Sequence, residues 1–233
     1  MTMIRANLQF VRERIARACA SAQRNVDEVR LLAVSKTFDA GAVREACAAG
    51  QTAFGENYIQ EAVDKMASLA DLPLEWHCIG PIQSNKTRLV AAHFDWAHTI
   101  DRLKIAQRLS EQRTPGKSPL QVCIQVNIDG GTTKSGVAPA DVLPLAREVA
   151  RLPGLTLRGL MTIPEPGPAD VMLAVHRRAR ALFDELQRAG VAVDTLSMGM
   201  TADLETAIAA GSTMVRIGTA IFGSRSYAGN AQA

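Results

Sequence analysis

The sequence predicts an α/β fold, a single (β/α)8 TIM barrel, and three observations support this prediction. Eight short runs rich in apolar and β-branched residues alternate with longer helical patterns along the 233-residue chain. Each strand-and-helix unit takes about 25 to 30 residues, which is the size of the unit in barrels of this class. No linker or shift in composition separates two parts, so we expect one domain over residues 1–233.

The segment before the first strand, residues 1–25, predicts an extra helix packed on the barrel. Its apolar side chains recur at helical spacing on one face, at Ile4, Leu8, Val11 and Ile15. The segment is rich in arginine, as mitochondrial transit peptides are, but Glu13 interrupts the basic run and hydroxyl side chains are few. We therefore interpret it as a structural helix.

The eight predicted strands follow in order, and each is bounded by glycine, proline or aspartate. They are residues 30–35, 52–56, 74–80, 95–100, 120–128, 157–163, 193–199 and 213–223. Three of the helices between them close with Ala-Gly, at Gly50, Gly190 and Gly211. Glycine readily adopts the left-handed conformation that ends a helix. Residues 224–233 are expected to form a polar C-terminal tail.

Composition argues against several classes of partner. Lys+Arg 26 and Asp+Glu 23 give a net charge of +3, and the basic residues are scattered, so we expect no nucleic-acid partner. No apolar run approaches the roughly 18 residues needed to cross a bilayer, so we expect no membrane contact. The four cysteines lack metal-ligand spacing and favour reduced thiols in a cytoplasmic protein. They are Cys19, Cys47, Cys78 and Cys123.

The stretch LLAVSK ends in Lys36 at the C-terminal end of the first strand, where barrels of this class gather their active sites. Period-two alternation puts Leu32, Val34 and Lys36 on one face, so the amine would stand above an apolar column. Desolvation favours the neutral amine, which is the form that attacks a carbonyl. The alternative is a lysine that extends into solvent at the barrel rim.

Arg216 lies in the middle of the eighth predicted strand, where a guanidinium is costly without a partner. In a closed barrel the eighth strand lies beside the first, so Arg216 would stand near Lys36. A neighbouring cation lowers the pKa of a lysine further, so both residues fit one site. The alternative is a structural ion pair elsewhere in the strand's surroundings.

The segments after the seventh and eighth strands suggest a phosphate site. Both run from a strand end through glycine, and barrels of this class often bind phosphate there through backbone N–H groups. The hydroxyls of Ser197, Thr201 and Thr219 could add hydrogen bonds. The alternative is ordinary helix capping by Thr201, with Asp203 and Glu205 in the first turn.

A lysine amine, a buried arginine and a phosphate site together predict pyridoxal 5′-phosphate (PLP) as the cofactor. The chain also resembles the family of PLP homeostasis proteins, which are related to the N-terminal barrel of alanine racemase. The resemblance covers nearly the whole chain and implies a barrel of the alanine racemase N-terminal type. It rests on LLAVSK, FGENYIQE, EWHCIGPIQSNK, FDWAHTIDR, GLMTIP and LSMGMTADLETAIAAGSTMVRIGTAIFG.

The resemblance implies specific roles around the cofactor ring. Lys36 would hold PLP as a Schiff base, Asn57 would lie near the 3-hydroxyl, and Arg216 would face the pyridine nitrogen. Because an arginine does not readily give up its proton, the ring nitrogen would stay unprotonated and the cofactor would be a weaker electron sink.

Seven more residues are implied around the rest of the site. His77 and Met161 would line the pocket, although a histidine at the barrel top could also act as a general base. The other histidines share no metal-ligand spacing, so we expect no metal. The phosphate-binding segments would contribute Ser197, Gly199, Met200, Gly218 and Thr219.

The expected function is to store, buffer or deliver PLP in the cytoplasm as a non-catalytic monomer, with apo forms of PLP-dependent enzymes as candidate acceptors. An amino-acid racemase is one alternative, and a cofactor-free Schiff-base aldolase is another. The racemases that this barrel resembles add a tyrosine from a further domain as a second base. The chain's tyrosines, Tyr58 and Tyr227, are not placed as that base, and no polar array for carbon–carbon cleavage is found.

Overall fold

The computed structural model, which describes residues 2–131 and 134–223, is a closed barrel of eight parallel strands. The strands follow one another around the barrel in chain order, and β8 closes it by pairing with β1. The predicted (β/α)8 barrel is therefore confirmed. The strands are β1 Arg30–Val34, β2 Ala53–Glu56, β3 Glu75–Cys78, β4 Trp96–Ile100, β5 Leu120–Val126, β6 Leu155–Thr162, β7 Thr195–Ser197 and β8 Met214–Ile217.

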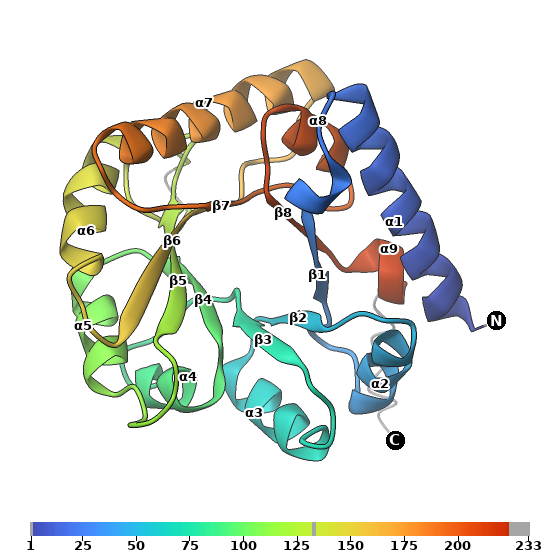
Figure 1. Ribbon diagram of the computed structural model, residues 1–233, viewed down its shortest axis with the longest axis horizontal. Coiled ribbons are helices and arrows are strands. Elements are labelled where there is room, and N and C mark those ends of the chain that lie inside the picture. The colour runs from blue at the N-terminus through green and yellow to red at the C-terminus, as the bar shows by residue number, and fades with distance from the viewer. Residues whose placement is uncertain (1, 132–133, 224–233) are drawn as a thin grey trace, which may run out of the picture.

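Helices surround the barrel on its outer face (Figure 1). Most of them connect one strand to the next, as the alternating pattern of the sequence requires. The helices are α1 Met3–Ser21, α2 Ala40–Ala48, α3 Ile59–Ser68, α4 Thr87–His93, α5 Leu103–Glu111, α6 Val142–Val149, α7 Ala169–Arg188, α8 Leu204–Ala209 and α9 Thr219–Phe222, with 3-10 turns η1 Val26–Glu28 and η2 Pro139–Asp141.

Alternation along the strands separates two packing regions. The larger apolar cluster fills the space between strands and helices and includes Ala33, Phe54 and Ile217. A smaller cluster inside the barrel contains Leu32 and Val34 from β1 with Ala53, Ile79 and Met214. The predicted apolar column below Lys36 is thus present.

The N-terminal segment forms a helix that packs on the barrel's helical layer. Helix α1 lies beside α8, α9 and α2 (Figure 1). Leu8, Val11 and Ile15 are buried as predicted, whereas Ile4 is only partly buried near the start of the helix. The helix ends at Ser21, four residues before the predicted boundary at residue 25.

The eighth strand is shorter than predicted, and this corrects the boundary at residue 223. The strand ends at Ile217, Gly218 turns the chain, and Thr219–Phe222 forms α9. The apolar residues Ile221 and Phe222 are buried by this turn, so they serve packing outside the sheet. The side-chain amide of Asn7 in α1 donates a hydrogen bond to the Ile221 carbonyl at 2.9 Å. Residues 224–233, including Tyr227, lie outside the described residues.

The other boundaries shift by a few residues. The third and seventh strands are shorter than predicted, and the sixth begins at Leu155. The three Ala-Gly helix ends are confirmed, with φ of 83° at Gly50, 78° at Gly190 and 96° at Gly211. In the described part of the chain, no helix combines the length and apolar character needed to cross a membrane.

Candidate functional site

A cavity of about 360 Å³ opens at the C-terminal ends of the strands. Its size is in the range of small-molecule sites. The residues that line it follow or end β1, β2, β3, β6, β7 and β8, so the closed barrel brings distant parts of the chain together. The lining residues are Val34, Lys36, Thr37, Phe38, Asn57, Ile79, Ile163, Met200, Thr201, Ala202, Arg216, Gly218, Thr219 and Gly223.

Lys36 stands in the turn directly after β1 and is partly buried at the cavity wall. The next residue, Thr37, has a φ of 69°. A left-handed backbone is unusual for a β-branched residue and costs on the order of 1–3 kcal/mol, so surrounding contacts must hold this turn.

A buried ion pair fixes the chain immediately before Lys36. Glu56 at the end of β2 accepts hydrogen bonds from the Ser35 hydroxyl and from Lys65 Nζ, both at 2.6 Å. Lys65 also donates to the Ser35 carbonyl at 3.0 Å. The side chains of Glu56 and Lys65 are only 1% and 10% exposed, so solvent screens their attraction weakly. This pair anchors the end of β1, and with it the turn that carries Lys36.

Arg216 is buried in β8 and lines the cavity. Its guanidinium donates to the carbonyl and hydroxyl of Ser197 at 2.7 and 2.8 Å and to the carbonyl of Thr162 at 2.8 Å. These acceptors are neutral oxygens, so its hydrogen-bond partners do not neutralise its charge. Burial lowers the pKa of Arg216 to about 10, opposed by the charge of Asp203, so the side chain stays cationic at neutral pH. Three of its five N–H donors are used by the described residues, which leaves donors for a ligand in the cavity.

Asn57 presents a hydrogen-bond acceptor to the cavity. Its Oδ1 atom is buried and has no hydrogen-bond partner among the described residues. A buried polar atom without a partner is costly, so this oxygen is suited to a ligand that donates a hydrogen bond. The main chain of Asn57 packs directly on Gly80, where a Cβ atom would lie 2.2 Å from the Asn57 carbonyl oxygen. Only glycine at position 80 allows this approach.

The opposite side of the cavity is built from small residues and hydroxyls. Gly218 follows β8 directly, and a Cβ atom there would lie 3.2 Å from the Val34 carbonyl oxygen. The first N–H groups of α9 follow, and such groups have no partner within their own helix. The hydroxyls of Thr219 and Thr201 lie 3.2 Å apart and join the two segments. This corner can receive an anionic group.

The acidic residues after β7 are engaged with other partners. Asp203 accepts a hydrogen bond from the Met200 N–H at 2.7 Å and lies 2.9 Å from His176 Nε2. Glu205 pairs with Arg14 of α1 at 2.8 Å. Thr201 does not cap α8, because the helix begins at Leu204 with Asp203 in the N-cap position. Because the Met200 N–H donates to Asp203, it is already engaged.

Six of the ten residues with implied roles line the cavity. The other four lie in the barrel interior or wall. His77 is fully buried, with Nε2 2.5 Å from Glu75 at the other mouth of the barrel, so it does not stand at the top of its strand. Met161 is buried against Trp96 and Cys123, and Ser197 holds Arg216. Gly199, with a φ of 96°, makes the turn after β7.

Several residues that shape the site were not singled out from the sequence. They are Glu56, Lys65, Glu75, Gly80 and His98. A charged residue at the end of an otherwise buried strand, as in TAFGE, was the available signal for Glu56. All four cysteines are free thiols, and no group of three potential ligands is placed to bind a metal within residues 2–131 and 134–223.

Comparison with known proteins gives one consistent group of relatives. A family model described as alanine racemase, N-terminal domain, matches residues 6–226. The chain is 58% identical over 228 residues to the pyridoxal phosphate homeostasis protein of Pseudomonas aeruginosa, covering 97% of this chain and 98% of the relative. The structure of PipY of Synechococcus elongatus with PLP bound is 40% identical with a TM-score of 0.80, covering 90% of this chain and all of PipY.

A Clostridium difficile alanine racemase shares the fold. It is 15% identical with a TM-score of 0.74, and the match covers 96% of this chain and 57% of the racemase. At this identity the likeness concerns the barrel alone.

Proposed function

Because the chain belongs to the family of pyridoxal phosphate homeostasis proteins, we propose that it binds PLP in the cavity at the C-terminal mouth and serves intracellular PLP homeostasis. The observation that carries this proposal is the meeting of Lys36, Asn57 and Arg216 on one cavity. An amine, a buried acceptor without a partner and a cationic donor match three different groups of the cofactor. The PLP-bound structure of PipY, a relative of this chain, supports the same conclusion.

PLP supplies an aldehyde that reacts with a primary amine, a phosphate, and a pyridine ring that can accept electron density. Lys36 would hold the aldehyde carbon, since its partly buried position at the cavity wall is the one expected of a nucleophilic amine. Asn57 Oδ1 would accept a hydrogen bond from the ring hydroxyl. The pair formed by Glu56 and Lys65 would keep the lysine turn in place.

Arg216 would face the ring nitrogen. A guanidinium only donates hydrogen bonds, so the nitrogen opposite it must act as the acceptor and remains unprotonated. This arrangement would weaken electron withdrawal by the ring.

The phosphate would lie at the corner formed by Gly218, Thr219 and Thr201. Backbone N–H groups at the start of α9 and the two hydroxyls are the available donors. Met200 would contribute its side chain to the wall, because its N–H is bound to Asp203.

We propose further that the chain stores, buffers or delivers PLP without appreciable catalysis, as a monomer in the cytoplasm. Racemisation needs acid–base groups on both faces of a substrate carbon. Among the described residues that line the cavity, the titratable side chains are Lys36 and Arg216, and the latter stays protonated. Apo forms of PLP-dependent enzymes are the candidate acceptors, since the cavity opens directly at the barrel mouth.

The decisive experiment is chemical trapping of the cofactor. Borohydride treatment of the PLP-loaded protein should fix the cofactor on the peptide that contains Lys36, as read by mass spectrometry. Lys36→Ala should lose the covalent link and keep the fold, whereas Lys104→Ala, a change at an exposed lysine of α5, should behave as the wild type. An adduct on another lysine, or no bound cofactor, would refute the proposal.

Delivery is tested separately. Loss of cofactor is compared in buffer alone and with an apo enzyme as acceptor. Faster loss in the presence of the acceptor indicates direct transfer, and equal rates indicate buffering only.

A further inference from the structure

A row of polar side chains crosses the inside of the barrel from Arg216 to the opposite mouth. Arg216 Nη1 lies 2.8 Å from the Ser197 hydroxyl, which lies 3.1 Å from His98 Nδ1. His98 Nε2 lies 2.9 Å from His77 Nδ1. His77 Nε2 then lies 2.5 Å from Glu75 Oε1. Four contacts therefore connect the cavity to the N-terminal ends of the strands.

The two ends of this row, with neutral imidazoles between them, fix the direction of every hydrogen bond in it. Arginine can only donate and an ionised carboxylate can only accept. His77 must therefore donate from Nε2 to Glu75, and its Nδ1 accepts from His98 Nε2. His98 Nδ1 in turn accepts from the Ser197 hydroxyl. Each member donates to the next, with neutral imidazoles in the two central positions.

The surroundings favour these neutral imidazoles. His77 and His98 are fully buried, with exposures of 0%. Burial lowers the pKa of His98 well below its ordinary value, and the charges of Arg216 and Arg30 act in the same direction. Burial also lowers the pKa of His77, although its hydrogen bond with Glu75 and the charges of Glu75 and Asp95 oppose the effect.

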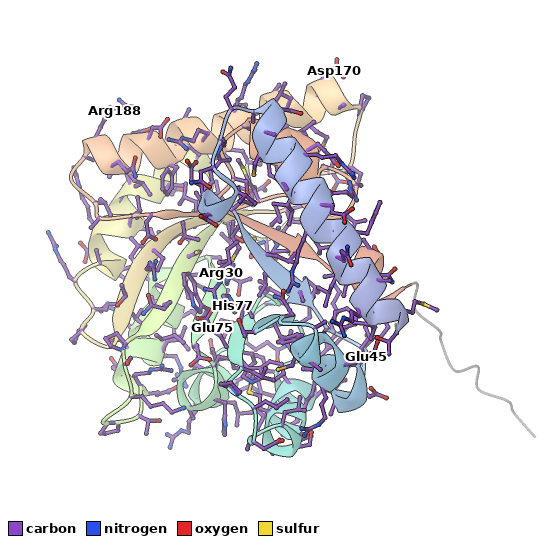
Figure 2. The ribbon with its side chains drawn as sticks, turned by 45° about the vertical axis from the view of Figure 1, so that its right-hand side comes forward. Arg30, Glu45, Glu75, His77, Asp170 and Arg188 are labelled. Atoms are coloured by element: carbon purple, nitrogen blue, oxygen red, sulfur yellow. The ribbon has the colours of Figure 1, made fainter. Side chains whose placement is uncertain are left out.

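Glu75 lies at the edge of a second hollow, of about 780 Å³, at the N-terminal mouth. Its side chain is 32% exposed and pairs with Arg30 Nη1 at 2.8 Å. Arg30, Glu75 and His77 lie next to one another (Figure 2). Burial raises the pKa of Glu75, but His77 and Arg30 together hold it below the ordinary value. Glu75 is thus ionised at neutral pH.

We propose that Glu75 is a remote positioning residue, which orients the cavity arginine Arg216 through His77, His98 and Ser197. This proposal rests on the proposed function in one respect, namely that Arg216 faces the PLP ring. When Glu75 is ionised, the Ser197 hydroxyl is committed to His98 and its oxygen lone pairs face Arg216. Without that charge, His77 and His98 can exchange their donor and acceptor nitrogens, and the Ser197 oxygen then accepts hydrogen bonds from both His98 Nδ1 and Arg216 Nη1. The Ser197 hydroxyl no longer donates to His98, so its oxygen becomes a weaker acceptor and holds the guanidinium less firmly.

The direction of the hydrogen bonds in this row is tested first by NMR of the isotope-labelled full-length protein, with and without added PLP. His77 and His98 should both carry their proton on Nε2 in the wild type. Exposed His93 provides the reference for an imidazole in contact with solvent. Ser197→Ala should alter the His98 Nδ1 signal most strongly. A proton on His98 Nδ1, or a doubly protonated His77, would overturn the proposal whether or not PLP binds.

The effect on the cavity is tested in the PLP-loaded protein with Glu75→Gln and Ser197→Ala. Each should shift the pH midpoint of the visible absorbance by about 0.5 unit or more, the scale of a lost charge or charged hydrogen bond. Asp194→Asn is the matched control, because it also removes a carboxylate at this mouth. Asp194 pairs with Arg158 and is not part of the row. If the pH midpoint shifts no more in these variants than in Asp194→Asn, the row does not influence Arg216.

The two variants also separate the possible failures. If Glu75→Gln does not fold, Ser197→Ala still removes the hydroxyl that links Arg216 to His98. If the wild type binds no PLP, the proposed function fails. The protonated nitrogens of His77 and His98 still decide whether the hydrogen bonds of the row run in the proposed direction.

Discussion

Arg216 donates two hydrogen bonds to one residue, Ser197, through the serine's carbonyl and hydroxyl oxygens at 2.7 and 2.8 Å. The two residues lie on neighbouring strands, β8 and β7, so the contact holds the guanidinium across the barrel interior. A buried cation is normally matched by a carboxylate. Here the hydrogen-bond partners are neutral, and the positive charge remains available to the cavity.

Replacing Arg216 should change the bound cofactor more than the fold. Arg216→Glu should favour a protonated ring nitrogen, so the visible spectrum and its pH dependence should change. Affinity should fall only partly, by about tenfold to a hundredfold, because the phosphate corner survives. Spectroscopic titration with PLP measures both effects.

Arg216→Met is the milder companion, since it removes the charge and keeps much of the volume. If Arg216→Glu unfolds the barrel and Arg216→Met leaves the spectrum and its pH dependence unchanged, the arginine has a purely structural role.

Breaking the buried pair of Glu56 and Lys65 should destabilise the protein strongly. Lys65→Met leaves the carboxylate buried with only the Ser35 hydroxyl, and such one-sided losses cost about 3–5 kcal/mol. Urea unfolding should therefore show a lower midpoint. The double variant Glu56→Gln, Lys65→Met should recover part of the loss, because no unpaired charge remains. Asp71→Asn, at the exposed pair with Arg44, should change the midpoint little.

Gly80→Ala should disturb the site through Asn57. The new methyl group would lie 2.2 Å from the Asn57 carbonyl oxygen, so the main chain must move. We expect a loss of about 1–3 kcal/mol in stability, typical of overpacking, together with weaker PLP binding. Gly167→Ala is the control, because its nearest neighbouring atom is 3.8 Å away. Equal effects of the two changes would contradict this role for Gly80.

The fold could be predicted because local patterns determine it. Alternation in LLAVSK placed Leu32 and Val34 inside the barrel, and the three Ala-Gly pairs marked helix ends. The end of the eighth strand could not be predicted this way. The apolar residues after Gly218 suit a buried strand or a buried helical turn equally well, and packing against α1 selects the turn.

The site was predictable in part. Lys36 and Arg216 stood out because each is a cation beside apolar strand residues, and the structure brings both to one cavity. His98 and Glu75 did not stand out, because their roles depend on which way each side chain points inside a closed barrel. That direction follows from strand register and from contacts between strands far apart in the sequence.

Amino acids should be turned over at trace rates at most. The described cavity residues supply one titratable amine, on Lys36, and no opposed base, so removal and return of a proton on opposite faces is not supported. Exchange of the α-proton of alanine in deuterated water, followed by NMR, is the measurement. Exchange of about 1 per second or faster, a rate typical of enzymes, would reinstate the racemase.

The carboxylate of Asp203 should make stability depend on pH on the acid side. Burial raises its pKa, but the hydrogen bonds from His176 and the Met200 N–H, together with the charges of His176 and Arg216, hold the pKa below its ordinary value of 3.8. A depressed pKa means that the ionised form stabilises the fold. This contribution is therefore present above the ordinary pKa and is lost as the pH falls through the lower, folded-state value.

Asp203→Asn tests this directly. At neutral pH the variant should lose about 1–3 kcal/mol in the free energy of unfolding, as expected when a charged acceptor of buried hydrogen bonds is removed. The difference from wild type should shrink as the pH falls below 3.8, because the wild-type carboxyl then takes up a proton as well. Asp39→Asn, which keeps a side-chain acceptor at the start of α2, is the control for replacing the carboxylate at a helix start. If the difference in the free energy of unfolding stays constant from neutral pH down to acid unfolding, the charge on Asp203 contributes nothing to stability. Its hydrogen bonds with Met200 and His176 would then contribute equally in the protonated and ionised forms.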